Sequence, residues 1–298
     1  MKILIISLAF LLLSCGVFAQ GQKTLKVLSI GNSFSHDGFS YVPFLMKEIA
    51  PEVDLTFAIA AIGGCTLEQH DTYSKDKEPR YDFHKYVPGA TTWIHKNPVH
   101  IKEALTEENW DIIILQQQSQ RSQDYATCQP FLDNFISYIF DNVSSPVKLA
   151  WHLTPSYGHI GNEGIEMYEK ISVTSQKVME NTPCQILIPN GTAIQNARGT
   201  YLKDLGDQKH MSGDNLHMQN GLPRQIEAYT TILVLLNECG MGYRGIFGNK
   251  TICDDKWLEG KLTWTTGKSV GSVPENLPLA QKCAIEAVKH PFSFTTIK

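Results

Sequence analysis

The feature that most constrains the fold is a series of short apolar segments that alternate with longer segments of helical spacing. The apolar segments are LKVLSI (25–30), VDLTFAIA (53–60), DIIILQ (111–116), VKLAWHL (147–153) and QILIPNG (185–191). The helical segments are 41–51, 128–142, 164–181 and 221–240. Short buried strands joined by helices are typical of a parallel sheet that is covered on both faces. We therefore predict an α/β fold, a three-layer α/β/α sandwich around a five-stranded parallel sheet.

The first 19 residues have the layout of a secretory signal peptide, with Lys2, an apolar core, and small residues before Gln20. A second interpretation is a lipobox at 12–15, which would leave Cys15 as a lipid-modified first residue. The apolar run is shorter than the roughly 20 residues that span a membrane, and no other stretch is apolar enough. We expect a periplasmic or secreted protein, with a lipoprotein at the cell surface as the alternative.

The remaining chain, 20–298, contains no linker or low-complexity stretch, and the sequence is 42% hydrophobic. This predicts a single domain with one large core, carrying an insertion at 67–110 near the active site and a C-terminal extension at 241–298. The formal net charge is −4 and the basic residues are scattered. The sequence therefore offers no basic surface for nucleic acid.

The cysteine and histidine patterns indicate no metal or cofactor. Six cysteines follow Cys15, an even number that permits disulfides in an exported protein, with Cys239 and Cys253 the nearest plausible pair. No CxxC, HxxH or HExxH motif occurs, and the histidines are dispersed.

Two short motifs suggest nucleophilic catalysis. Ser33 lies in GNSFSHDG directly after the first predicted strand, and Asp214 and His217 lie three residues apart in SGDNLHMQNG. A carboxylate at this spacing can accept the Nδ1 proton of the imidazole while Nε2 acts as a base for a serine hydroxyl. Each motif alone also fits an ordinary turn or a helix cap.

The order of the motifs GNSFS, GGCTLEQH, ILQQQS, IPNGTAIQNAR and DNLHM over residues 24–240 resembles the SGNH hydrolase superfamily, and more narrowly its branch DUF4886. The resemblance implies a flavodoxin-like hydrolase fold. It also implies Ser33 as the nucleophile, His217 as general base and acid, and Asp214 as the residue that orients the imidazole. The oxyanion hole would comprise the backbone N–H groups of Ser33 and Gly64 and the side-chain amide of Gln118.

Two positions depart from the superfamily pattern. Asn32 stands where aspartate is usual, and glutamines replace the usual GxND turn. Gln116 and Gln118 leave the strand on the same side by period-two alternation, and Gln118 better matches the missing asparagine. We therefore expect Gln116, together with Asn32 and Arg198, to contact the substrate; an arginine that bridges loops is the alternative for Arg198.

The combined pattern predicts a secreted serine esterase that removes acyl groups, most plausibly acetyl, from a carbohydrate. The expected partner is a small-molecule or glycan ester. The alternatives are a lipase or thioesterase of the same superfamily and a non-catalytic glycan-binding protein with this fold. Geometry discriminates between catalysis and binding, because a binding protein has no reason to keep Ser33, His217 and Asp214 in hydrogen-bonding register.

Overall fold

A computed structural model describes residues 22–157, 162–242, 246–262 and 267–297 of the chain. The predicted signal peptide and Cys15 lie outside the described residues. Within the described part, no helix combines the length and apolar character needed to cross a membrane.

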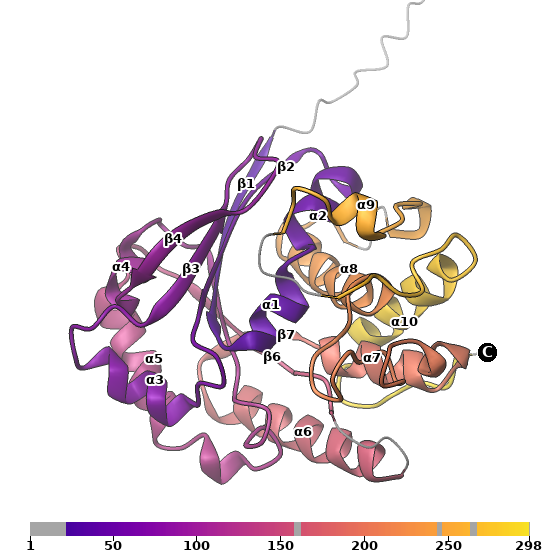
Figure 1. Ribbon diagram of the computed structural model, residues 1–298. Helices are drawn as coiled ribbons and strands as arrows, with labels where there is room; N and C mark the ends of the chain where they lie inside the picture. The colour runs from indigo at the N-terminus through magenta and orange to yellow at the C-terminus, as the bar shows by residue number, and fades with distance from the viewer. Residues whose placement is uncertain (1–21, 158–161, 243–245, 263–266, 298) are drawn as a thin grey trace, which may run out of the picture.

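The core element is a seven-stranded sheet with the order β4-β3-β2-β1-β5-β6-β7 (Figure 1). Its strands are β1 (Lys23–Gly31), β2 (Val53–Ala61), β3 (Tyr81–Tyr86), β4 (Ile94–Val99), β5 (Ile112–Leu115), β6 (Lys148–His152) and β7 (Cys184–Ile188). Strands β2, β1, β5, β6 and β7 pair in parallel, so the five predicted strands and the α/β class are confirmed. The sheet as a whole is mixed, because β3 and β4 from the insertion add antiparallel at one edge.

Helices cover both faces of this sheet, which gives the predicted three layers (Figure 1). Their bounds are α1 (Ser33–Phe39), α2 (Val42–Ile49), α3 (Leu67–Ser74), α4 (Ile101–Thr106), α5 (Phe131–Asn142), α6 (Asn162–Asn181), α7 (Asn190–Arg198), α8 (Leu222–Glu238), α9 (Asp255–Leu258) and α10 (Leu277–Lys289). One core cluster joins the sheet to α1, α2 and α8, and a second joins the opposite face to α3, α4 and α5.

The last helix of the C-terminal extension, α10, packs against α7 and α8. It therefore extends the layer that carries α1. The predicted strand at 185–191 is too long, since β7 ends at Ile188 and α7 begins at Asn190.

Most of the aromatic residues of the insertion anchor it to the core. Tyr81, Phe83, Tyr86 and Trp93 are all buried, and the Trp93 indole donates to the Ser40 carbonyl oxygen at 3.1 Å. These rings are therefore used for packing and do not form an exposed platform for a sugar.

A disulfide between Cys239 and Cys253, the pair that the sequence made most plausible, is not formed. All six cysteines of the described chain are free, and five of them are buried. They act as small apolar core residues, which is a common role for buried cysteine.

Candidate active site

A tight strand-to-helix turn presents Ser33 at the carboxyl end of β1. Gly31 ends the strand, and a Cβ atom there would lie 2.5 Å from Ser35 Oγ, so only glycine fits. Asn32 follows as the N-cap of α1, its Oδ1 accepting from the Phe34 N–H at 3.1 Å. Ser33 is thus the first residue of the helix, with a half-buried side chain at the rim of the sheet.

The structure brings Ser33, His217 and Asp214 together as a chain of hydrogen bonds. Ser33 Oγ lies 2.8 Å from His217 Nε2, and His217 Nδ1 lies 2.7 Å from Asp214 Oδ2. The other carboxylate oxygen, Oδ1, accepts from the backbone N–H groups of Leu216 and His217. This is the register in which an imidazole can take the proton of a serine hydroxyl.

Hydrogen bonds keep Asp214 ionised. Burial alone would raise its pKa, but the bond from the His217 side chain and the two backbone N–H donors outweigh burial and hold the pKa of Asp214 below its usual range. A charged carboxylate beside Nδ1 favours the tautomer that leaves Nε2 free to accept a proton.

A buried ion pair fixes the loop that carries His217. Asp37 on α1 pairs with Arg224 on α8 at 2.7 Å, and its other oxygen accepts from the Met218 N–H at 3.1 Å. Arg224 Nε donates to the Met218 carbonyl oxygen at 2.9 Å. The N–H and the carbonyl group of Met218, which follows His217, are therefore both held by one ion pair that links α1 to α8.

The two loops predicted to form an oxyanion hole flank Ser33. In the sheet β1 lies between β2 and β5, so Ser33 is bordered by the loop after β2, which contains Gly64, and by the loop after β5, which contains Gln118. Gly64 is exposed and has a φ of +66°, a left-handed conformation that favours glycine. Gln118 Oε1 accepts from the Gln120 N–H at 2.9 Å, and its Nε2 has no protein partner among the described residues.

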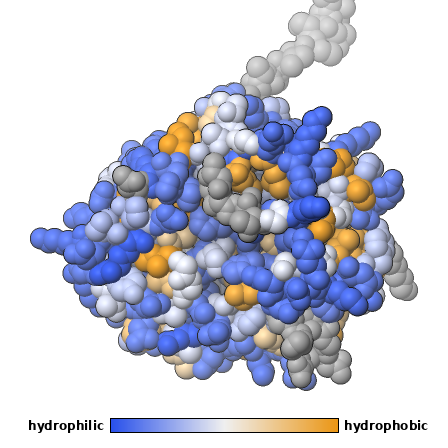
Figure 2. Space-filling model, viewed as in Figure 1, coloured by the Kyte–Doolittle hydropathy of each residue, from blue (hydrophilic) through white to orange (hydrophobic). Residues whose placement is uncertain are grey.

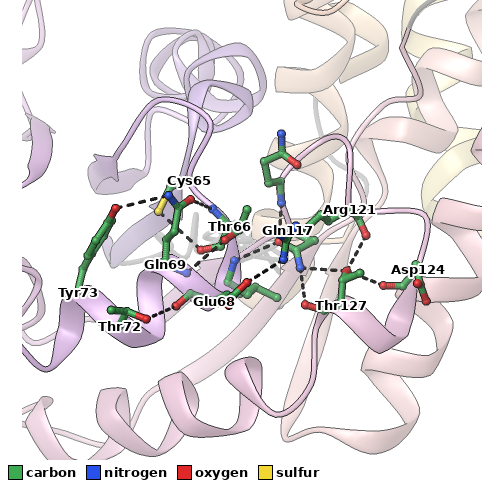
Figure 3. A network of polar contacts seen from close by, with 12 residues as sticks. Cys65, Thr66, Glu68, Gln69, Thr72, Tyr73, Gln117, Arg121, Asp124 and Thr127 are labelled. Atoms are coloured by element: carbon green, nitrogen blue, oxygen red, sulfur yellow. Dashed lines mark hydrogen bonds and ion pairs between the residues drawn. The ribbon is translucent and has the colours of Figure 1, made fainter.

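Gln117 joins these two loops, a role that the sequence did not indicate (Figure 3). Its Oε1 accepts from the backbone N–H groups of Leu67 at 3.1 Å and Gln118 at 2.8 Å, and its Nε2 donates to the Thr127 carbonyl oxygen at 3.0 Å. An ion pair of 2.9 Å between Arg121 and Glu68 adds a second link. The buried amide of Gln117 therefore ties the loop after β2 to the loop after β5.

Asn32 and Gln116, two of the three residues predicted to contact substrate, lie in a buried network beneath Ser33. Gln116 Nε2 donates to Asn32 Oδ1 at 2.7 Å, and Gln116 Oε1 lies 2.8 Å from His152 Nδ1. Asn32 Nδ2 donates to the Cys65 carbonyl oxygen at 3.1 Å. The expectation of substrate contact therefore differs from the structure, because the polar atoms of both side chains are used inside the protein.

Arg198 is also buried and bridges two loops. Its Nη1 donates to the Ser156 carbonyl oxygen at 2.9 Å, and its Nε donates to the His210 carbonyl oxygen at 3.2 Å. Burial lowers the pKa of Arg198 to about 10. The structure thus supports the bridging alternative for Arg198 and not the predicted substrate contact.

A cleft of about 360 Å³ opens beside Ser33 and His217. Most of its lining residues are polar in type, with Met218 as the one apolar side chain, but polar and apolar atoms face the cleft in similar proportion; the other lining residues are Ser33, His36, Asp37, Asp207, Gly213, Asp214, His217, Gln219, Asn220, Arg224 and Gly267. Gly64 and Gln118 are outside this lining, on loops that border Ser33 from other directions. The face drawn in Figure 2 is mostly hydrophilic, with hydrophobic residues in small separate patches.

Comparison with solved structures gives two levels of similarity. A crystal structure of a DUF4886 family protein from Bacteroides uniformis ATCC 8492 has 27% sequence identity and a TM-score of 0.76, and the match covers 92% of this chain and 98% of that one. A candidate SGNH hydrolase from Slackia heliotrinireducens has 14% identity and a TM-score of 0.44, covering 72% of this chain and 100% of that one. The lipase Lip_vut3 from a goat rumen metagenome has 13% identity and a TM-score of 0.44, covering 73% of this chain and 98% of that one.

Comparison of the sequence with curated proteins gives no significant match. The model of the domain of unknown function DUF4886 matches residues 26–239, which span the strands of the sheet and the whole of the Ser33–His217–Asp214 arrangement. The chain therefore belongs to the DUF4886 family.

Proposed function

We propose that this protein is an exported serine esterase that removes small acyl groups, acetyl above all, from carbohydrate. The observation that carries the proposal is the 2.8 Å contact between Ser33 Oγ and His217 Nε2, with Asp214 on the far nitrogen of the ring. A protein that only binds glycans has no need to hold Ser33, His217 and Asp214 in one chain of hydrogen bonds, whereas acyl transfer requires this arrangement.

The proposed reaction follows from the positions of these groups. His217 Nε2 takes the Ser33 proton as Oγ attacks the ester carbonyl carbon, and the carbonyl oxygen becomes an oxyanion. The backbone N–H groups of Ser33 and Gly64 and the amide of Gln118 would stabilise that charge. His217 then returns the proton to the departing sugar oxygen, and a water molecule, activated in the same way, releases the acyl group from Ser33.

The lining of the cleft favours a substrate ester that joins a polar alcohol to a short acyl group. Hydroxyl groups of a sugar can bond to the exposed carboxylate of Asp207 at its wall, whereas a long acyl chain would need a continuous apolar groove. A lipase or thioesterase is thus the less favoured alternative.

A panel of esters tests this function. We expect kcat/KM to be highest for acetyl esters of a common leaving group and to fall as the acyl chain lengthens, and we expect acetate release from acetylated polysaccharides. A preference for long chains would indicate a lipase instead. Binding of glycans without hydrolysis of any ester would favour the non-catalytic alternative.

The amide of Gln118 can be tested separately. Because an oxyanion donor acts mainly in the transition state, Gln118→Ala is expected to lower kcat by roughly 10²- to 10³-fold with little change in KM. Gln120→Ala removes an exposed side chain of the same type two residues away and is the matched control, with near-wild-type kcat expected. Equal kcat values for the two variants would remove Gln118 from the oxyanion hole.

A further inference from the structure

Three potential metal ligands meet on the antiparallel edge of the sheet, although the sequence pattern predicted no metal. His84 on β3 is directly paired with His95 on β4, and Asp82 precedes His84 by two residues. Residues at i and i+2 of a strand share a face, and directly paired residues share it too. One ligand atom from each of the three side chains lies within 4.8 Å of the others.

We propose that Asp82, His84 and His95 bind a divalent transition-metal ion such as Zn²⁺. His95 Nε2 lies 3.0 Å from Asp82 Oδ1, and His84 Nε2 lies 3.9 Å from Asp82 Oδ2. In a tetrahedral zinc site, bonds of roughly 2.0–2.1 Å place neighbouring ligand atoms about 3.3 Å apart. The three atoms are thus near the spacing of a zinc site, and a turn of the exposed His95 ring out of its stack with His84 would direct a nitrogen of each ring at one ion.

The burial of the three residues suits a site that is both anchored and accessible. The His84 side chain is 4% exposed, while His95 and Asp82 are 49% and 55% exposed. The imidazoles of His84 and His95 stack with ring centroids 4.6 Å apart. His84 thus provides a fixed ligand, and the two outer side chains can close on an ion that arrives from solvent, with water completing its coordination.

The ligand types limit the class of metal. Two imidazoles and one carboxylate suit Zn²⁺ and neighbouring transition metals, whereas Ca²⁺ and Mg²⁺ prefer sets of oxygen ligands. The site also lies close to the cleft, because the ring of His36, which lines the cleft, makes an edge contact with the His84 ring at 5.3 Å.

Zinc binding by the purified chain tests this proposal without any activity assay. After treatment with EDTA and its removal, we expect titration calorimetry to show one Zn²⁺ per chain. His95→Ala and Asp82→Asn change exposed residues, so both are expected to fold, and each should weaken binding at least tenfold. Zn²⁺ at about 100 times the wild-type Kd should raise the Tm of the wild type by about 5 °C and that of His95→Ala by no more than about half as much.

His290→Ala is the matched control, since His290 is 57% exposed and also lies near a carboxylate, that of Glu286. This variant is expected to bind Zn²⁺ as the wild type does. Co²⁺ should give the intense visible absorption of a four-coordinate site in the wild type and lose it in His95→Ala. The proposal is overturned if Zn²⁺ does not bind stoichiometrically, if both site variants keep wild-type affinity, or if Mg²⁺ or Ca²⁺ displaces Zn²⁺ at equal concentration.

Discussion

Ser33→Ala is expected to lower kcat/KM for an activated acetyl ester by about 10⁴- to 10⁶-fold, because it removes the atom that forms the acyl-enzyme bond. The hydroxyl group bonds to His217 and to no other described residue. Its loss should therefore have little effect on the fold. Steady-state kinetics measures the first effect, and thermal unfolding measures the second.

The matched control is Ser35→Ala, which changes the other serine of the GNSFS motif. Ser35 Oγ is buried and bonds to Ser29 Oγ at 3.0 Å and to Gln116 Oε1 at 3.3 Å, so it faces the network beneath the turn and not the cleft. Its loss is expected to cost about 1 kcal/mol of stability and less than a tenfold change in rate. A fluorophosphonate probe should form one adduct, at Ser33, and fail to label Ser33→Ala. Near-wild-type turnover by Ser33→Ala would disprove the nucleophile assignment.

The parallel strands could be predicted from the sequence because each is buried on both faces and is therefore a continuous apolar run. The edge strands β3 and β4 could not. Their sequences, YDFHKY and IHKNPV, mix polar and apolar residues, and they are strands because they pair with β2 and with each other. The same pairing creates the His84–His95 contact, which no sequence spacing reveals.

Two helices next to the site were missed for different reasons. Helix α1 reads SFSHDGF, which is rich in poor helix formers, and it is stabilised by the Asn32 cap and by packing against α8. Helix α7 is buried on every side, so it lacks the apolar stripe of an amphipathic helix.

The site residues differ in how far the sequence alone could predict their positions. Ser33, Asp214 and His217 could be predicted as a group because the order of the motifs along the chain depends on topology and Ser33 directly follows a strand. The side of the strand on which Gln116 emerges was also predictable by alternation, but alternation does not distinguish a cleft wall from a buried layer below it. Only the contacts with Asn32 and His152 show that Gln116 supports the turn.

Asp214→Asn should separate the proposed catalytic role of Asp214 from its structural role. The asparagine carbonyl can still accept from the Leu216 and His217 N–H groups, so the loop is expected to keep its shape. Its NH₂ group, however, would face His217 Nδ1 and favour the tautomer with the proton on Nε2, which cannot accept a proton from Ser33. We expect kcat to fall by about 10³-fold with little change in KM; the fall should be smaller than the roughly 10⁴-fold loss for a buried triad carboxylate, because the Asp214 side chain is 56% exposed.

The control for this experiment is Asp214→Ala, which removes both the tautomer preference and the acceptor for the two N–H groups. It should reduce kcat to a similar extent and also lower the Tm, whereas Asp214→Asn should leave the Tm almost unchanged. Hydrogen bonds hold the pKa of Asp214 below its usual range, so the wild-type carboxylate is ionised at neutral pH, where the variants are compared. If Asp214→Asn kept wild-type kcat while Asp214→Ala lost stability, Asp214 would serve only to shape the loop, and the orientation of His217 would have to come from the Asp37–Arg224 pair that holds the next residue.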